Sequence, residues 1–199
     1  MKNHFIKYGL VIIGTMIAAF GVTLIIKAGI GADPISTFLL GCLKFVHIKF
    51  GTASQLFCVT LLVLNLLLDR KNIGLGSIIY GVGCGFFINM FMPLDLSVMA
   101  MIPNVFIVLI GVILLGAGIA LYLCTKTGAG PLEGLMVFFA EKTNFSIKAT
   151  RIGLDALLVV IGIILGGQFG VGTLIGVFLT GPTIELTLKM LNKVRVFSF

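Results

Sequence analysis

The chain has 199 residues, of which 59% are hydrophobic and 11% are charged, and its mean hydropathy is +1.21. One soluble domain of this size could not bury so much apolar surface, so the composition excludes an ordinary soluble protein and indicates an integral membrane protein in contact with the lipid bilayer. The formal net charge of +7 does not indicate a nucleic-acid partner, because the basic residues stand singly or in pairs at the ends of apolar segments. There they act as orientation signals and headgroup contacts.

Six apolar segments are about long enough to cross roughly 30 Å of hydrocarbon as helices. They cover residues 5–26, 52–68, 73–92, 104–124, 147–165 and 171–190. Two further segments, 34–47 and 131–142, predict short helices that are re-entrant or interfacial, because they are too short and too polar for full crossings. The expected fold class is all-α: a polytopic membrane helix bundle with six transmembrane helices and two short helices.

The chain contains an internal duplication. Residues 27–34, Lys-Ala-Gly-Ile-Gly-Ala-Asp-Pro, are called the first joint here, and residues 126–133, Lys-Thr-Gly-Ala-Gly-Pro-Leu-Glu, the second joint. In both, an apolar segment ends at a lysine, paired glycines follow, and a proline stands where a short helix could begin. The joints are 99 residues apart, and the segments from Gly74 and Gly170 match at a spacing of 96. We therefore expect a single membrane domain, 1–199, built from repeat one, 5–92, and repeat two, 104–190.

Three spans in each repeat would give the two repeats opposite orientations in the membrane. The two joints would then face opposite sides, as is common in alternating-access transporters. If the N- and C-termini are cytoplasmic, six spans leave only Lys27, Lys44 and Lys49 outside, in agreement with the positive-inside rule. If the short helices also crossed, the resulting eight spans would place almost as large a majority of the basic residues on the cytoplasmic side. Helix length, rather than charge, favours six.

The joints are the first candidate binding site. Each one sets glycine-rich backbone before a helix start, where free N–H groups and the helix dipole favour an anion and a nearby lysine strengthens the field. The alternative is structural: the acidic residues cap their helices and the lysines reach lipid headgroups. The candidate substrate-binding residues are Lys27, Gly29, Gly31, Asp33 and Pro34 in the first joint, and Lys126, Gly128, Gly130, Pro131 and Glu133 in the second.

Polar side chains within the apolar spans are candidates for ion coupling. Asp155 lies about two turns into its span, and an ionisable residue at this depth indicates a functional site, although Arg151 four residues earlier offers it a local ion pair. Glu185 is followed by Lys189 at the same spacing, which could be an interfacial pair. It also lies 96 residues after Asn89, so both repeats carry a polar side chain at the equivalent position.

The sequence does not predict an enzyme, because it lacks a nucleophile with a base, a phosphate-binding loop or a dinucleotide fingerprint. No cofactor is expected. The four cysteines fall in apolar segments without metal-ligand spacing, and the two histidines are far apart, so no metal site is expected either.

Both joints, together with the run Gly-Gly-Gln-Phe-Gly-Val-Gly-Thr at 166–173 and the pair Gly181-Pro182, resemble the YczE/YyaS/YitT family of bacterial integral membrane proteins. The resemblance covers nearly the full chain. It implies the fold and a location in the bacterial inner membrane, and because the family is largely uncharacterised it implies no substrate.

The leading functional hypothesis is a small-molecule or ion transporter with alternating access between two inverted repeats. Two other hypotheses stay open. One is a substrate-binding subunit of a larger importer, which would need an energising partner. The other is a non-transporting accessory protein that scaffolds or regulates another membrane protein. A homo-oligomer or a membrane partner protein is compatible with all three.

Overall fold

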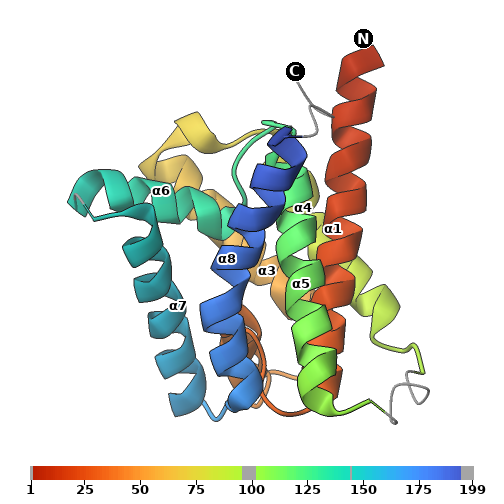
Figure 1. Cartoon of the computed structure of the whole chain (residues 1–199). Coiled ribbons are helices and arrows are strands. Elements are labelled where there is room, and N and C mark those ends of the chain that lie inside the picture. The colour runs from red at the N-terminus through yellow and green to blue at the C-terminus, as the bar shows by residue number, and fades with distance from the viewer. Residues whose placement is uncertain (1, 96–101, 144, 194–199) are drawn as a thin grey trace.

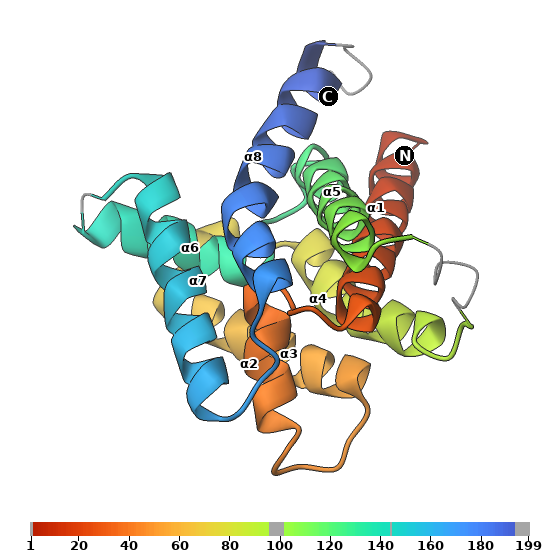
Figure 2. The same ribbon diagram turned by 60° about the horizontal axis from the view of Figure 1, so that its bottom comes forward.

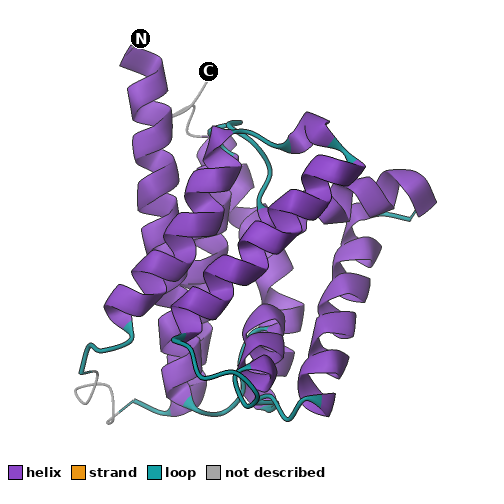
Figure 3. Ribbon diagram, turned by 180° about the vertical axis from the view of Figure 1, so that it is seen from behind, coloured by secondary structure: helices purple, strands orange, loops and turns teal. Residues whose placement is uncertain are grey.

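The computed structural model describes residues 2–95, 102–143 and 145–193, and this part of the chain consists of helices and loops (Figure 3). A helix is present in each segment that the sequence predicts to be helical, and both short helices begin at the expected prolines, but the first of them ends at Cys42 rather than near residue 47. The helices are α1 (Lys2–Ala28), α2 (Pro34–Cys42), α3 (Phe50–Leu68), the 3-10 turn η1 (Arg70–Asn72), α4 (Leu75–Phe91), α5 (Asn104–Leu123), α6 (Pro131–Thr143), α7 (Ile147–Ile164) and α8 (Val171–Lys193).

Among the described residues, four helices are long and apolar enough to cross a membrane: α1 from Phe5, α3, α5, and α8 as far as Leu191. The helix α4 is apolar but has only 17 residues. The helix α7 has 18 residues and carries Lys148, Arg151 and Asp155 in its first half, which makes it more polar. The expectation of six spans therefore depends on whether α4 and α7 also cross the membrane.

The most extensive contact between described helices is that of α1 with α5, which run antiparallel and lie side by side in Figures 1 and 2. Small residues let the two backbones approach closely. A Cβ atom at Gly14 would lie 2.7 Å from the carbonyl oxygen of Gly118, and one at Gly111 would lie 2.9 Å from that of Gly21. Glycines are therefore required where the two helices cross.

The helix directions can be followed in Figure 1. From the N-terminus at the upper end, α1 descends, α3 rises and α4 descends; then α5 rises, α7 descends and α8 rises. The short helix α2 lies at the lower end and packs against α7, whereas α6 lies at the upper end and packs against α3. Each short helix thus packs against a helix of the other half of the chain.

The outward surface of the bundle is strongly apolar. Leu67 on α3 is 73% exposed, Ile164 on α7 is 77% exposed and Phe178 on α8 is 68% exposed. Large exposed apolar side chains on several neighbouring helices would be a liability in water, and hydrocarbon is the solvent that suits them.

Candidate functional site

The first joint requires glycine and contacts the start of α8. Gly29 and Gly31 have φ angles of 70° and 120°, which residues with a Cβ atom rarely adopt. A Cβ at Gly31 would also lie 2.8 Å from the backbone nitrogen of Thr173 and 2.9 Å from that of Gly170. The amide of Ala32 donates a hydrogen bond to Thr173 Oγ1 at 3.2 Å. The joint is therefore held against the second half of the chain.

The second joint contacts the start of α4 in an equivalent way. Lys126 and Gly128 have φ angles of 53° and 132°. A Cβ at Gly128 would lie 2.5 Å from the backbone nitrogen of Gly74, and the amide of Gly76 donates to the carbonyl of Thr127 at 3.1 Å. Because the start of α4 matches the start of α8 at a spacing of 96 residues, the two joints contact matching positions in opposite halves.

Asp33 caps α2, as the structural interpretation of the joint expects. Its Oδ2 accepts a hydrogen bond from the amide of Ser36 at 3.3 Å, and Pro34 occupies the first turn, where its missing N–H costs nothing. The residue is 5% exposed, and its Oδ1 accepts no hydrogen bond from any described residue. Half of this buried carboxylate therefore has no partner.

Arg151 on α7 bridges two carboxylates. Its Nε lies 2.9 Å from Asp155 Oδ2 one turn along the same helix, which confirms the ion pair expected from their spacing. Its Nη1 lies 3.3 Å from Oε1 of Glu133, in the first turn of α6. Glu133 and Asp155 are 8% and 4% exposed, and Asp155 Oδ1 has no partner among the described residues. These three residues are called the ion triad here.

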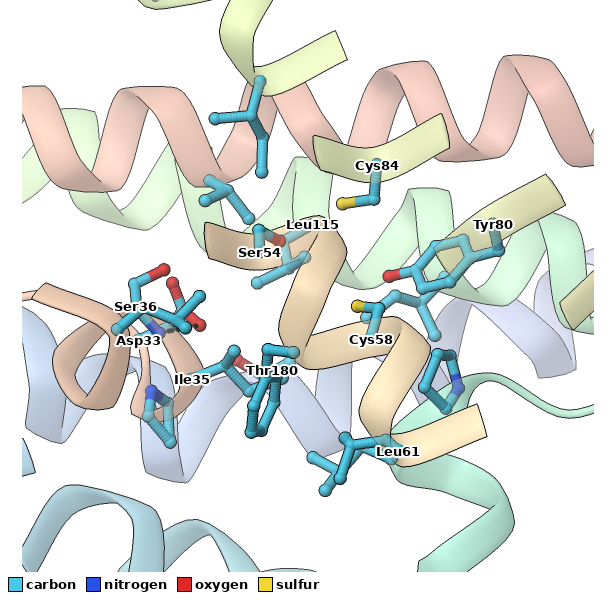
Figure 4. Close-up of a pocket in the computed structure, with 18 of the residues that line it drawn as sticks. Asp33, Ile35, Ser36, Ser54, Cys58, Leu61, Tyr80, Cys84, Leu115 and Thr180 are labelled. Atoms are coloured by element: carbon cyan, nitrogen blue, oxygen red, sulfur yellow. Dashed lines mark hydrogen bonds between the residues drawn. The ribbon is translucent and has the colours of Figure 1, made fainter. Parts of the chain in front are cut away.

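The first joint, the second joint and the ion triad meet at one cavity of about 70 Å³, which we call the chamber. This volume is enough for a few water molecules or a small ion or headgroup. In Figure 4, Cys58 from α3 and Tyr80 and Cys84 from α4 face the same space as Asp33. The polar side chains that line it are Asp33, Ser36, Ser54, Cys58, Tyr80, Cys84, Glu133, Arg151, Asp155 and Thr180.

The chamber is negatively charged when its side chains are ionised. Three carboxylates, Asp33, Glu133 and Asp155, line it together with one guanidinium, that of Arg151. Since an isolated buried charge is costly, the excess of carboxylates favours a cation or a proton over an anion at this position. This sign is opposite to the one that the helix starts and lysines of the joints favour.

The other predicted site residues lie away from the chamber. Lys27 and Lys126 are exposed, and Lys27 Nζ donates to the carbonyl of Leu94. Asn89 joins α4 to the start of α3, because its Oδ1 accepts from the amide of Gly51 at 3.0 Å. Glu185 forms the expected pair with Lys189, and both side chains are largely exposed. Asn89 and Glu185 therefore stand at equivalent positions of the two repeats but in different surroundings.

Sequence reasoning did not include several lining residues in the candidate site. The ring of Tyr80 stacks on that of Tyr122 with centroids 4.4 Å apart, which joins α4 to α5 beside the chamber. Ser54 and Cys58 on α3 are four residues apart, as are Tyr80 and Cys84 on α4. This helical spacing of polar groups within otherwise apolar spans is the signal that could have revealed them.

These features define a class of protein: a helical membrane protein with a charged internal chamber. The chain belongs to the family of unknown function DUF6198, whose model matches residues 5–189. It is 30% identical over 191 residues to the uncharacterized protein YyaS of Bacillus subtilis, covering 94% of each chain.

Two further relatives are of similar length. An uncharacterized protein of Haemophilus influenzae is 29% identical over 178 residues, with coverage of 89% of this chain and 81% of the relative. The uncharacterized membrane protein YczE of Bacillus subtilis is 27% identical over 176 residues, with coverage of 88% and 82%. No solved structure matches the chain. The comparisons agree with the resemblance found in the joints and with a membrane protein, and none of the relatives' names states an activity.

Proposed function

We propose that the protein is a small-molecule or ion transporter of the bacterial inner membrane that exposes the chamber alternately to the two sides. In this proposal α1, α3, α4, α5, α7 and α8 cross the bilayer, and repeats 5–92 and 104–190 are inverted within one domain. The chain is then not an enzyme and needs no cofactor, and its partners are the bilayer and its substrate.

The helix directions support the inverted arrangement. The sequence down, up, down for α1, α3 and α4 is reversed for α5, α7 and α8, and the two short helices lie at opposite ends (Figure 1). The matching contacts of the joints with Gly74 and Gly170 are a second, independent support. Such repeats are common in secondary transporters, where the substrate site lies at their interface.

The polarity of α7 is compatible with a full crossing. Its charged Arg151 and Asp155 are directed into the ion triad, where each contacts a group of opposite charge, so hydrocarbon does not have to solvate them. The helix α4 is short, but its 17 residues extend about 26 Å at 1.5 Å per residue, close to the thickness of the hydrocarbon core.

The observation that carries the proposal is the convergence of both joints on one chamber. Asp33 and Pro34 line it from the first joint, and Pro131 and Glu133 line it from the second. A ligand in the chamber would therefore touch both repeats, and a rotation of one repeat against the other could change the side from which the ligand is reached.

Alkylation of the native chamber cysteines tests this function. In a variant with Cys42→Ser and Cys124→Ser, the remaining Cys58 and Cys84 both line the chamber. An impermeant cationic thiol reagent should modify them from the outside in right-side-out vesicles and from the inside in inverted vesicles, at comparable rates. Modification from one side only would contradict alternating access and would favour a binding subunit or an accessory protein.

The crossing of the membrane by α3, on which the inverted topology depends, gives a second expected result. In a cysteine-free background, His47→Cys tests the exposed loop before α3 at the lower end, and Arg70→Cys tests the exposed turn after α3 at the upper end. If the termini are cytoplasmic, an impermeant reagent should label position 47 in intact cells and position 70 only after the membrane is opened. Labelling of both from the same side would rule out that α3 crosses.

A further inference from the structure

The two halves of the bundle differ where their last two helices meet. In the first half, α3 packs along α4: the backbones of Gly51 and Gly85 approach too closely for a side chain, and Gln55 Nε2 donates to the carbonyl of Val82 at 2.9 Å. In the second half, α7 and α8 contact each other only sparsely. They lie apart along most of their length in Figures 1 and 2. The second half is open where the first is closed.

A groove of about 530 Å³ occupies the open position, and we call it the lateral groove. Its apolar walls come from α5, α6, α7 and α8, and Ile152 and Phe178 are 44% and 68% exposed. Six of the apolar lining residues are Leu123, Met136, Ile152, Val177, Phe178 and Leu188. The volume lies within the range of about 300–1,000 Å³ that is usual for sites of drug-sized molecules.

The lateral groove and the chamber share two residues. Glu133 and Arg151 line both spaces, so the ion triad stands between the apolar groove and the smaller charged chamber. Glu133 and Arg151 thus form a common wall, and on its far side the chamber is lined by Asp33 and Asp155, each with one oxygen that has no partner among the described residues. Both of these residues are at least nine-tenths buried.

We propose that the ligand of the chamber is an amphipathic organic cation, which enters from the bilayer between α7 and α8. The proposal rests on the transport function proposed above and adds the class of substrate. The apolar body of the ligand occupies the lateral groove, and its positive charge lies beside Glu133, where the carboxylates of Glu133, Asp155 and Asp33 together attract it. The exposed lysines of the joints do not line either space.

The sign of the charge and the two volumes together select this class. A hydrophilic ion could bind in the chamber alone and would make no contact with the apolar groove. An amphipathic anion would fit the groove but would meet an excess of carboxylates, because the one guanidinium is already shared between Glu133 and Asp155. A cation with an apolar body satisfies both spaces.

Binding of two matched probes to the purified full chain in lipid nanodiscs tests the proposal. Tetraphenylphosphonium and tetraphenylborate have similar size and shape and opposite charge, and tetraethylammonium is a cation with a smaller apolar body. We expect saturable binding of tetraphenylphosphonium, at least about tenfold weaker binding of tetraethylammonium, and for tetraphenylborate no saturable binding beyond that of empty nanodiscs. A tenfold change corresponds to about 1.4 kcal/mol.

Substitutions at four positions locate the binding. Asp33→Asn removes the charge and keeps a good helix cap. The double variant Asp33→Asn with Asp155→Asn should weaken tetraphenylphosphonium binding at least about tenfold. Gly181 lines the lateral groove, and a Cβ there would meet no atom within 4 Å, so Gly181→Trp should fill the groove and abolish binding. Gly153 on α7 has equally open space and does not line the groove, so Gly153→Trp should bind like the unchanged protein.

The outcomes separate this proposal from the transport function. Equal binding of both tetraphenyl ions, or unchanged binding in the Asp33 and Gly181 variants, would overturn the assignment of an amphipathic cation to these two spaces. Binding of tetraethylammonium alone, lost in Asp33→Asn, would also overturn it, while alternating access would stand. Alkylation of Cys58 and Cys84 from one side only would contradict the transport function. Binding of tetraphenylphosphonium would then identify the protein as a receptor for the same cation.

Discussion

Arg151→Met should destabilise the protein by about 3–5 kcal/mol, the largest effect expected for any chamber substitution. The guanidinium is the only described cation that bridges Glu133 and Asp155, and its removal leaves two buried carboxylates facing each other without compensation. The loss should appear as a large fall in the thermal unfolding midpoint of the detergent-purified protein. It should also appear as reduced expression.

An exposed ion pair of the same spacing is the matched control. Lys189 pairs with Glu185 four residues earlier on α8, and the two side chains are 72% and 68% exposed. Because exposed pairs contribute little, Lys189→Met should leave the unfolding midpoint nearly unchanged. Equal effects of the two substitutions would show that the ion triad is no more important to stability than a surface pair.

Neutral replacements distinguish a structural triad from a functional one. The double variant Arg151→Gln with Asp155→Asn leaves the buried carboxylate of Glu133 without its cation, so it should recover stability only in part. The triple variant that adds Glu133→Gln should recover most of it, since removing a complete buried charge cluster is often neutral. If the carboxylates serve the ligand, the triple variant should be stable and unable to bind tetraphenylphosphonium.

Gly31→Val should be the most damaging substitution in the joints, with an expected loss of about 2–5 kcal/mol. A β-branched residue is strained at a φ of 120°, and its Cβ would lie within 2.9 Å of backbone atoms of Gly170 and Thr173, which have no room to move aside. Thermal unfolding and yield of folded protein measure the effect. The apolar spans are unchanged, so insertion into the membrane should continue.

Gly153→Val controls for the introduction of valine itself. Gly153 lies within α7, where a Cβ would meet no atom within 4 Å, so its substitution should change stability by less than about 1 kcal/mol. A Gly31→Val variant as stable as this control would mean that the first joint is a flexible connector rather than a close-packed contact between the halves.

The sequence predicted the elements of the fold well, because their signals are local. Apolar segments of sufficient length, interrupted by glycine and proline at 29–34 and 128–131, determine where helices begin and end. The packing partners were not predictable, since spans that are apolar on every side do not indicate which face is turned inward. The contacts of α2 with α7 and of α6 with α3 are of this kind.

The candidate site could be predicted only in part. Asp155 is recognisable because a carboxylate within an apolar span is conspicuous in sequence, and Asp33 and Glu133 are recognisable because they belong to the two repeated joints. Arg151 was interpreted as a local partner of Asp155, and its contact with Glu133, 18 residues earlier, depends on the angle between α6 and α7, which local patterns do not encode. For the same reason, the sequence could not indicate that the lysines of both joints lie outside the chamber.

The glycine contacts between α1 and α5 have a consequence for how such a chain could originate. Gly14 meets Gly118 and Gly21 meets Gly111, so the contact points are seven residues apart on each helix and are paired in antiparallel order. An isologous interface would need the same residues on both sides, but at the repeat spacing of 99 residues Gly21 corresponds to Ala120 and Gly111 corresponds to Ile12. Two copies of repeat one could therefore not pair as closely as α1 and α5 do, because Ile12 would take the place of Gly111 beside Gly21, so the glycines of this contact belong to two halves that have diverged in sequence.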